Sequence, residues 1–441
     1  MTISRNSAAS RSITTFMRWS LCGLLVVGVN AGCTKDVNRC TQDSDCGDVA
    51  YPFCDMDGHY PASGGLAGVC TVTPADCPAE RCGCEPGATT CTGDALKICD
   101  SSGRSETSVS CNPGCATAGA RCLSFVPTNG LNLALMSAAN EPDITIPAMA
   151  TINTDTGVIQ DVANLPITVT SLVVPQSGAS DVRVFIGRSF KLSSIVFTGT
   201  RPAAFVAVGD IVIDGLLDLG GDNPTERPGA GQQTSGACVG QISQPGGGGW
   251  GNATPGGKSI SANSSAVGQG GAMLSGTTLV GGCTGGGGTS DGFGGGAIQI
   301  DSLSRITITA SGGISINGSA GSDRIGGGSG GMAILEAPKV EILGGIFANG
   351  GSGGACGTAG QSGQLSTRPA IAPSGCGTNG LTHGGDGGSS TAAPTAGAGV
   401  GGGGGGGGSV GRLFVTTVGP YSTSSDAVVS ASTTTTAMVP Q

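Results

Sequence analysis

The chain has 441 residues, 85 of them glycine, a formal net charge of −9, and only 11% charged residues. An acidic chain without a basic stripe is repelled by phosphate backbones, which excludes nucleic acid as a partner. Collagen is excluded because no G-x-y period is present. Helix is disfavoured because glycine costs roughly 1 kcal/mol per helical position relative to alanine. Runs of Ile, Val and Leu still supply a core, so the composition predicts a mainly β protein.

Residues 1–32 have the features of a secretory signal peptide. Three basic residues precede its apolar run: Arg5, Arg11 and Arg18. That run, residues 21–29, is too short to span a bilayer, since a spanning helix needs about 20 residues. The sequence VNAGC then ends in Cys33 and resembles a bacterial lipobox, in which the cysteine receives lipid, although Asn30 stands where that pattern has an apolar residue. The alternative is ordinary cleavage near Ala31.

The cysteines after Cys33 form two blocks with an even number in each. The first block comprises Cys40, Cys46, Cys54, Cys70, Cys77, Cys82, Cys84, Cys91, Cys99, Cys111, Cys115 and Cys122, and the second comprises Cys238, Cys283, Cys356 and Cys376. In an exported chain this pattern predicts disulfides. Zinc is the rival interpretation, but no C-x-x-C occurs and His59 is the only histidine near the first block. We therefore predict a disulfide-rich region over residues 33–122, with no metal and no cofactor.

Residues 123–189 are expected to form a β-rich connector that also serves as an N-terminal cap. Short apolar runs separated by turn residues predict strands within residues 144–152, 167–174 and 182–186. A stack of coils would otherwise present an open strand edge at its first coil, and such edges are normally covered.

The fold class that we predict for residues 190–435 is a parallel β-helix or solenoid, followed by a tail over residues 436–441. One pattern occurs twice, as GGAIQIDSLSRITITASGGISINGSAG at residues 295–321 and GGMAILEAPKVEILGGIFANGGSG at residues 330–353. The two copies match at Ile300 and Ile334 (34 residues apart), Ile306 and Val340, Ile308 and Ile342, Ile314 and Ile346, and Asn317 and Asn349. Apolar residues at every second place indicate strands, which are too short to bury one face alone and so must stack. The two asparagines are expected to form a side-chain ladder.

Two long Gly-rich inserts, residues 222–293 and 351–409, interrupt this pattern after equivalent strands and should emerge on the same side. We predict one disulfide in each, Cys238 with Cys283 and Cys356 with Cys376. The eight glycines of residues 401–408 could be packed extended strands, but a flexible tether is the default expectation. Trp250 and Phe293 are the candidate ligand contacts in these loops.

The sequence predicts no catalytic residue. His383 lacks a marked serine partner and is expected to be an exposed loop residue, since no G-x-S-x-G motif occurs. Parallel β-helices often act on polysaccharides through carboxylates and a basic residue, and the candidates here are Asp210, Asp214, Asp218, Asp301 and Glu336, with Arg305 or Lys339. Outward-facing strand positions must be polar in any case, so a structural role is expected for all of them.

The module order resembles a class of exported proteins. The lipobox-like cysteine, the block C…CGC-x6-C…C…C-x3-C…C, and then SFVPTNG and RPAAFVAVGDIVIDG with Gly-rich loops are similar to cysteine-rich and glycine-rich surface lipoproteins of myxobacterial type. The Gly-rich half is similar in composition to PE-PGRS proteins. The resemblance implies a cell-surface address and no particular activity.

From these features we predict an outer-membrane, cell-surface or extracellular lipoprotein that is attached to the membrane by lipid. Its expected role is structural or adhesive, with disulfide-closed Gly-rich loops displayed to a glycan or a matrix protein. The alternative is a polysaccharide lyase or hydrolase that uses Asp and Glu on the face of the solenoid.

Overall fold

A computed structural model describes most of residues 40–438. The stretches that it does not describe are residues 1–39, 43–44, 47–52, 56–67, 72–83, 85–86, 94, 101–104, 112–113, 117–119, 123–125, 132–140, 222–226, 234–239, 241, 244–245, 262–266, 287–291, 376–380, 400–402 and 439–441. The predicted leader, Cys33, Cys77, Cys82, Cys238 and Cys376 therefore lie outside the described residues. The described part of the chain is mainly β, with parallel and mixed sheets, a disulfide-rich N-terminal region, and no helix capable of crossing a membrane.

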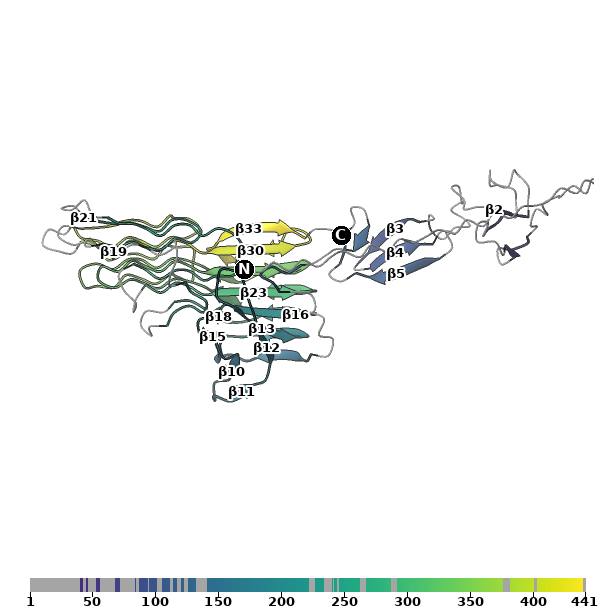
Figure 1. Cartoon of the computed structure of the whole chain (residues 1–441), viewed down its shortest axis with the longest axis horizontal. Helices are drawn as coiled ribbons and strands as arrows, with labels where there is room; N and C mark the ends of the chain where they lie inside the picture. The colour runs from purple at the N-terminus through teal and green to yellow at the C-terminus, as the bar shows by residue number, and fades with distance from the viewer. Residues whose placement is uncertain are drawn as a thin grey trace, which may run out of the picture. The chain divides into compact units, whose positions relative to one another are not determined.

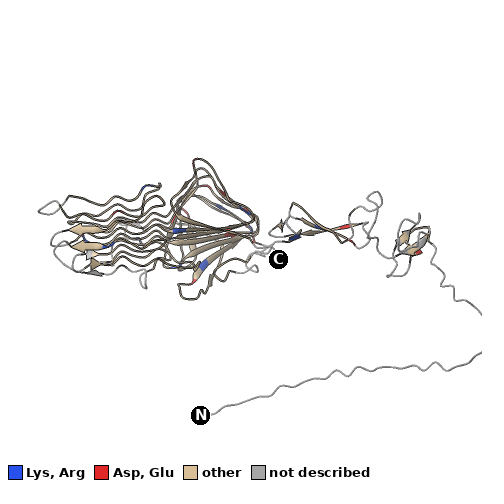
Figure 2. Ribbon diagram, turned by 90° about the horizontal axis from the view of Figure 1, so that it is seen from above, with Lys and Arg blue, Asp and Glu red and all other residues tan. Residues whose placement is uncertain are grey.

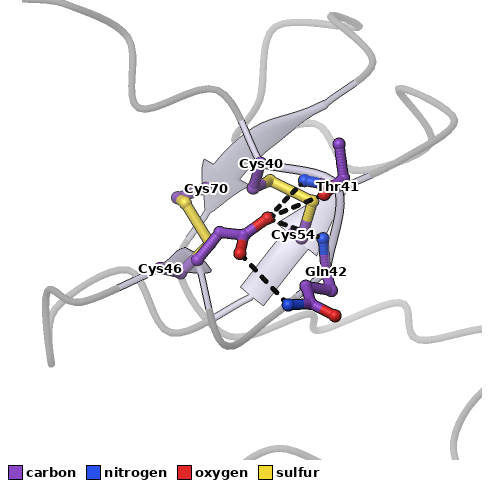
Figure 3. The surroundings of a disulfide bond; sticks show 7 residues. Cys40, Thr41, Gln42, Cys46, Cys54 and Cys70 are labelled. Atoms are coloured by element: carbon purple, nitrogen blue, oxygen red, sulfur yellow. Dashed lines mark hydrogen bonds between the residues drawn. A yellow bond between two sulfur atoms is a disulfide. The ribbon is translucent and has the colours of Figure 1, made fainter.

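The chain divides into two compact units, and the first comprises Met1–Pro86 with Ser101–Arg104. Its described strands are β1 (Phe53–Asp55) and β2 (Val69–Thr71), which pair antiparallel. Two disulfides hold this small sheet, Cys40–Cys54 and Cys46–Cys70 (Figure 3). The boundary between the two units falls within residues 33–122, which were predicted to form one disulfide-rich region. The two halves of that region therefore belong to different units.

The second unit begins with another cross-linked sheet. Its antiparallel strands are β3 (Thr89–Thr92), β4 (Ala95–Cys99) and β5 (Glu106–Ser110), followed by the hairpin β6 (Cys115–Ala116) and β7 (Arg121–Cys122). Disulfides Cys91–Cys115 and Cys111–Cys122 tie the hairpin to the sheet. Cys84 and Cys99 are disulfide-bonded as well. The disulfide prediction is thus confirmed for every described cysteine of the first block.

Three larger sheets form the body of the second unit (Figure 1). The seven-stranded sheet runs β12 (Thr170–Val174), β13 (Val182–Gly187), β16 (Ala203–Ala207), β23 (Ala297–Ser302), β26 (Met332–Glu336), β30 (Arg412–Thr417), β33 (Ser432–Ala437). The eight-stranded sheet runs β11 (Pro166–Ile167), β10 (Val158–Gln160), β9 (Ala150–Asn153), β15 (Ile195–Thr198), β18 (Leu216–Asp218), β25 (Gly313–Ser315), β28 (Gly345–Phe347), β32 (Val428–Val429). The six-stranded sheet runs β31 (Ser422–Thr423), β27 (Lys339–Ile342), β24 (Arg305–Ile308), β17 (Ile211–Ile213), β14 (Ser189–Leu192), β8 (Asp143–Ile146).

Consecutive strands enter the three sheets in turn. β13, β14 and β15 each occupy a different sheet, and β16, β17 and β18 pair with them in parallel. β8 and β9 already pair in parallel with β14 and β15. The parallel stacking therefore starts at Asp143, and the predicted start near residue 190 is too late. β10, β11 and β12, which lie in the region predicted to be a connector and cap, add to the sheets antiparallel.

Aliphatic side chains stack in register across the parallel strands of each sheet. Ile146, Leu192, Ile213, Ile308 and Ile342 are successive partners across the six-stranded sheet, and all have no exposed surface. The predicted matches of Ile306 with Val340 and of Ile314 with Ile346 are confirmed.

One predicted match is wrong by a single residue. Ile300 pairs with Leu335, and Ile334 pairs with Gln299. A shift of one residue moves a side chain to the opposite face of a strand. Ile300 and Leu335 accordingly pack in the inner core, whereas Ile334 packs against the outer face of the sheet.

The described parts of the Gly-rich inserts are packed segments that lie beside the three sheets (Figure 1). Their short strands are β19 (Ile242–Ser243), β20 (Gly246–Gly247), β21 (Ser259–Ser261), β22 (Val267–Gly268) and β29 (Gly397–Gly399). β21 belongs to the first insert and β29 to the second, and they pair in parallel. The prediction that both inserts emerge on the same side is therefore confirmed.

The described part of the glycine run, residues 403–408, is not a flexible tether. Each backbone N–H from residue 404 to residue 409 donates to another segment: Gly404 to Ala398, Gly405 to Gly354, Gly406 to Gly247, Gly407 to Thr395, Gly408 to Gly351, and Ser409 to Trp250. Residues three apart in the run thus donate to the same neighbouring segment, as Gly404 and Gly407 do to the segment of residues 395–398. Three residues per turn without internal hydrogen bonds is the geometry of a polyproline II-type helix. The alternative weighed for this run, packed extended strands, is the one observed.

The described segments of the two Gly-rich inserts together form what we call the Gly-rich array. Close approach of one backbone segment to another explains why glycine is needed in this array. A Cβ on Gly406 would lie 2.1 Å from the Gly257 carbonyl oxygen, and one on Gly405 would lie 1.9 Å from that of Ile325. Neither glycine has a positive φ, in contrast to the turn residue Gly199 at φ 102°. Most of these glycines are therefore required for space rather than for a left-handed backbone. Figure 2 shows how few charged residues the array carries.

Candidate functional site

The most unusual side chains of the described chain are two carboxyl groups on the seven-stranded sheet. Asp301 near the end of β23 and Glu336 at the end of β26 are partner residues in the parallel register. Their chain neighbours Ile300 and Leu335 point into the inner core, so the two acids point to the opposite, outer face of the sheet. Asp301 has no exposed surface and Glu336 is 1% exposed.

Neutral donors surround the carboxyl pair. The Gln299 amide nitrogen donates to Asp301 Oδ2 at 3.0 Å and to Glu336 Oε2 at 3.1 Å. The Thr128 backbone N–H donates to Glu336 Oε2 at 2.9 Å, and Asn129 Nδ2 donates to Gln299 Oε1 at 2.9 Å. A segment that lies far away in the sequence therefore covers the pair.

Burial raises the pKa of Asp301 well above its ordinary value, and the neighbouring charge of Glu336 raises it further. Burial also raises the pKa of Glu336, although hydrogen bonds from Thr128, Asp301 and Thr416 oppose the rise. Two carboxylates in contact cannot both ionise at low cost. We therefore expect the pair to retain a proton under conditions in which exposed acids have lost theirs.

A cavity of about 340 Å³ adjoins Glu336. Its walls are Val126, Thr128, Thr277, Ile334, Glu336, Phe414, Thr416, Thr436, Ala437 and Met438. Most of these groups are apolar or hydroxyl-bearing, so the cavity suits a small, weakly polar molecule. The combination of a cavity and a proton-holding carboxyl pair is the arrangement closest to an active site in the described structure.

Arg412 lies on the same sheet face and is 7% exposed. Its Nη1 donates to the Gly276 carbonyl oxygen at 2.8 Å, and its guanidinium lies 5.5 Å from the centre of the Phe414 ring. Burial lowers its pKa to about 10. Within the described residues no carboxylate forms an ion pair with it, so it anchors a loop and does not neutralise the acids.

The other predicted acids do not join this pair. Asp210 accepts a hydrogen bond from Ser304 at 2.6 Å, Asp214 forms an ion pair with Lys191 at 3.1 Å, and Asp218 forms one with Arg227 at 2.6 Å. Each acid thus has a local structural partner on a different edge or sheet.

The predicted basic residues also lie elsewhere. Arg305 and Lys339 are partners at the start of β24 and β27 in the six-stranded sheet, and Lys339 pairs with Glu341 at 2.7 Å. His383 is exposed, as expected, with Nδ1 3.0 Å from the Gly384 carbonyl oxygen. The groove of several acids with one base that the enzyme alternative requires is therefore not formed among the described residues, and only Asp301 and Glu336 of these candidates are brought together.

The two candidate contact aromatics are interior residues. Trp250 is 2% exposed and packs with Cys283 and Leu274, and Phe293 is 6% exposed. The structure places neither side chain on the surface, because the segments that carry them are packed into the array. Both side chains are therefore core residues of these segments.

The described cysteines of the second block, Cys283 and Cys356, are both disulfide-bonded. Their expected partners Cys238 and Cys376 lie outside the described residues, so these two pairings stay predictions. In the first unit the sulfur atoms of Cys40, Cys46 and Cys70 lie within 4.8 Å of one another. All three cysteines form disulfides, so none of them is a thiolate that could bind a metal (Figure 3).

Comparisons with known proteins give no family for this chain: no family model matches it, and neither curated proteins nor solved structures give a significant match. The site residues that the sequence did not single out are Gln299, Thr128, Thr416, Phe414 and Arg412. Thr128 is separated from Glu336 by 208 residues and no local pattern links them. The one available signal was the spacing from the preceding Gly-Gly pair, which is the same for Asp301 and Glu336.

Proposed function

We propose that this protein is an exported structural or adhesive protein in which a parallel β-solenoid supports a rigid Gly-rich array. The parallel pairing of β13, β16, β23, β26 and β30 supports the solenoid, because each coil adds one strand to each sheet. The number of disulfides supports an oxidising, extracellular or exported environment.

The observation that carries the proposal is the hydrogen bonding of the glycine run. Consecutive amides from Gly404 to Ser409 each bind a neighbouring segment, so the array has a fixed shape. An extended surface of small, uncharged residues offers no catalytic groups but can lie flat against a long polymer. A glycan chain or a matrix protein is the partner class that fits such a surface.

Membrane attachment through Cys33 is part of the proposal. Its test is metabolic labelling with a radioactive fatty acid in an expressing bacterium, with Cys33→Ala as the matched variant. Label on the wild type alone supports lipidation, whereas a processed but unlabelled wild type shows ordinary signal cleavage.

The adhesive role is tested by binding of the purified chain to glycan arrays and to immobilised extracellular matrix. Leu365 and Ile371 are exposed by 53% and 61% on the second insert, and the control pair, Val162 and Leu165, is exposed by 64% and 61% near β10 and β11. Leu365→Ser with Ile371→Ser should weaken binding about tenfold or more, while Val162→Ser with Leu165→Ser should leave it unchanged. Equal effects of the two double variants would refute an adhesive surface on the array.

A polysaccharide lyase or hydrolase is the second candidate, favoured by the Asp301–Glu336 pair beside the cavity. Its test is the appearance of reducing ends or unsaturated products from a panel of polysaccharides. Activity that disappears in Glu336→Gln and persists in Glu341→Gln supports the enzyme. Binding without products leaves the adhesive role.

A further inference from the structure

β33 is an unprotected edge of the seven-stranded sheet. It pairs with β30 on one side, and the described part of the chain places no strand on its other side. All six of its residues, Ser432–Ala437 with the sequence STTTTA, are exposed. The opposite edge of the same sheet is closed by antiparallel β12, and the eight-stranded sheet is closed by β10 and β11.

The backbone groups at this edge can be assigned. Ser432 N–H donates to the Gly411 carbonyl oxygen at 2.9 Å, and Met438 N–H donates to that of Thr417 at 2.9 Å. Alternate residues of a strand bind the same neighbour, so Thr434 and Thr436 also face β30. Thr433, Thr435 and Ala437 therefore direct their N–H and C=O groups away from the sheet.

Within the described residues, β33 shows none of the usual protections of an edge strand. Native edges carry lysine, proline or a bulge, or are kept very short. β33 has no charged residue and no proline, and Asp426 is the only charged residue between positions 418 and 438. Core residues Tyr421, Ala427 and Val429 are only partly buried at this end of the stack. At this end of the three sheets, β33 therefore has unpaired backbone groups and the neighbouring apolar side chains are only partly buried.

We propose that β33 pairs with β33 of a second copy of this chain, antiparallel, across a twofold axis at Thr435. In this register Thr435 lies opposite the partner's Thr435, and Thr433 lies opposite the partner's Ala437, so every outward-facing residue finds a backbone partner. Thr434 then lies beside the partner's Thr436, a favourable cross-strand pair. Such an isologous contact closes on itself and gives a dimer. β31 and β32, the other edges at this end, are two residues long and offer little pairing.

The first test is the mass of the full chain in solution, measured by light scattering and sedimentation at micromolar concentrations. We expect a dimer for the wild type and for Thr435→Ala. Thr435→Pro removes one outward N–H that β30 does not use, so it should yield folded monomer with at least a tenfold weaker dimer and an unchanged circular dichroism spectrum. A dimer that survives Thr435→Pro, or a wild type that is monomeric throughout, overturns the proposal.

Cross-linking then tests the register independently of the mass. Cα atoms of a hydrogen-bonded antiparallel pair are about 5.5 Å apart. Thr435→Cys should therefore form a covalent dimer with a short bis-maleimide. In Thr433→Cys the cysteine of one copy lies four residues along the paired strands from the cysteine of the other copy, a distance of about 13 Å. This variant should therefore not react. Equal cross-linking of the two variants, or of neither, contradicts pairing centred on Thr435.

Discussion

Asp301 and Glu336 lie side by side on β23 and β26 as partner residues, buried together on the outer face of a parallel sheet. Thr128 and Asn129, which precede the first strand of the three sheets, cover the two acids. Thr128 donates a hydrogen bond to Glu336, and Asn129 donates one to Gln299. The pair therefore fastens a distant segment to the sheet and borders the cavity. Its burial means that its protonation state affects folding whether or not it also serves a reaction.

Stability should depend on pH through this pair. The pKa of Asp301 is raised above its ordinary 3.8 and that of Glu336 above 4.5, so folding favours the protonated form. The stabilisation is complete below these ordinary values and is lost as the pH rises through the raised ones. We expect the free energy of unfolding to fall by up to about 1.4 kcal/mol per pH unit for one proton in that window.

Asp301→Asn removes this ionisation while keeping a hydrogen-bonding side chain. Denaturant unfolding measured between about pH 4 and 8 should give a flatter curve for this variant than for the wild type. Asp210→Asn is the control, because Asp210 is exposed and should leave the wild-type slope intact. Parallel curves for the wild type and Asp301→Asn would show that Asp301 does not hold the proton.

Alanine in the array should be far more damaging than alanine elsewhere. In Gly406→Ala the new Cβ would meet the Gly257 carbonyl oxygen, and two packed segments would have to separate. We expect a loss of about 3 kcal/mol or more, measured by thermal unfolding. Gly419→Ala is the matched control, since no atom lies within 4 Å of its added Cβ. A tolerated Gly406→Ala would mean that the segments are loosely held.

The asparagine pair should contribute through one buried hydrogen bond. The Asn349 N–H donates to Asn317 Oδ1 at 2.7 Å, and Asn349 Nδ2 donates to the Ser366 carbonyl oxygen at 2.6 Å. Asn317→Ala leaves a buried N–H without its acceptor and should cost about 1–3 kcal/mol. Asn317→Asp keeps the acceptor and should recover part of the loss. No change in either variant would indicate that water replaces the side chain.

Trp250 should respond as a core residue. Its indole Nε1 is buried and has no hydrogen-bond partner in the described structure. Trp250→Phe removes that unsatisfied group and should change stability little, while Trp250→Ala should cost about 3–5 kcal/mol. Ligand binding by Trp250→Phe should equal that of the wild type. A variant that folds normally but no longer binds would restore Trp250 as a contact residue.

The sequence predicted the β class and much of the register because period two and stacked isoleucines report directly on burial. Ile306, Ile308 and Ile314 were matched correctly for this reason. Ile300 was misaligned because it was matched with Ile334 by residue identity. Both copies also contain two glycines followed, after four residues, by an acid, at Asp301 and Glu336. Aligning the copies on this pattern gives the observed pairing of Ile300 with Leu335. Glycine has no side chain and therefore no periodicity, so the hydrogen bonding of residues 404–409 could not be predicted. The burial of Trp250 and the contact of Thr128 with Glu336 depend on that same packing and on distant sequence.

The order of the glycine run is tested most directly by hydrogen–deuterium exchange of its backbone amides. The amides of residues 404–409 are each bonded to a neighbouring segment, so they should be protected to a degree that approaches that of β23 and β26. Exchange of these amides at the rate of an unstructured peptide, while β23 and β26 remain protected, would contradict a packed array and restore a flexible tether.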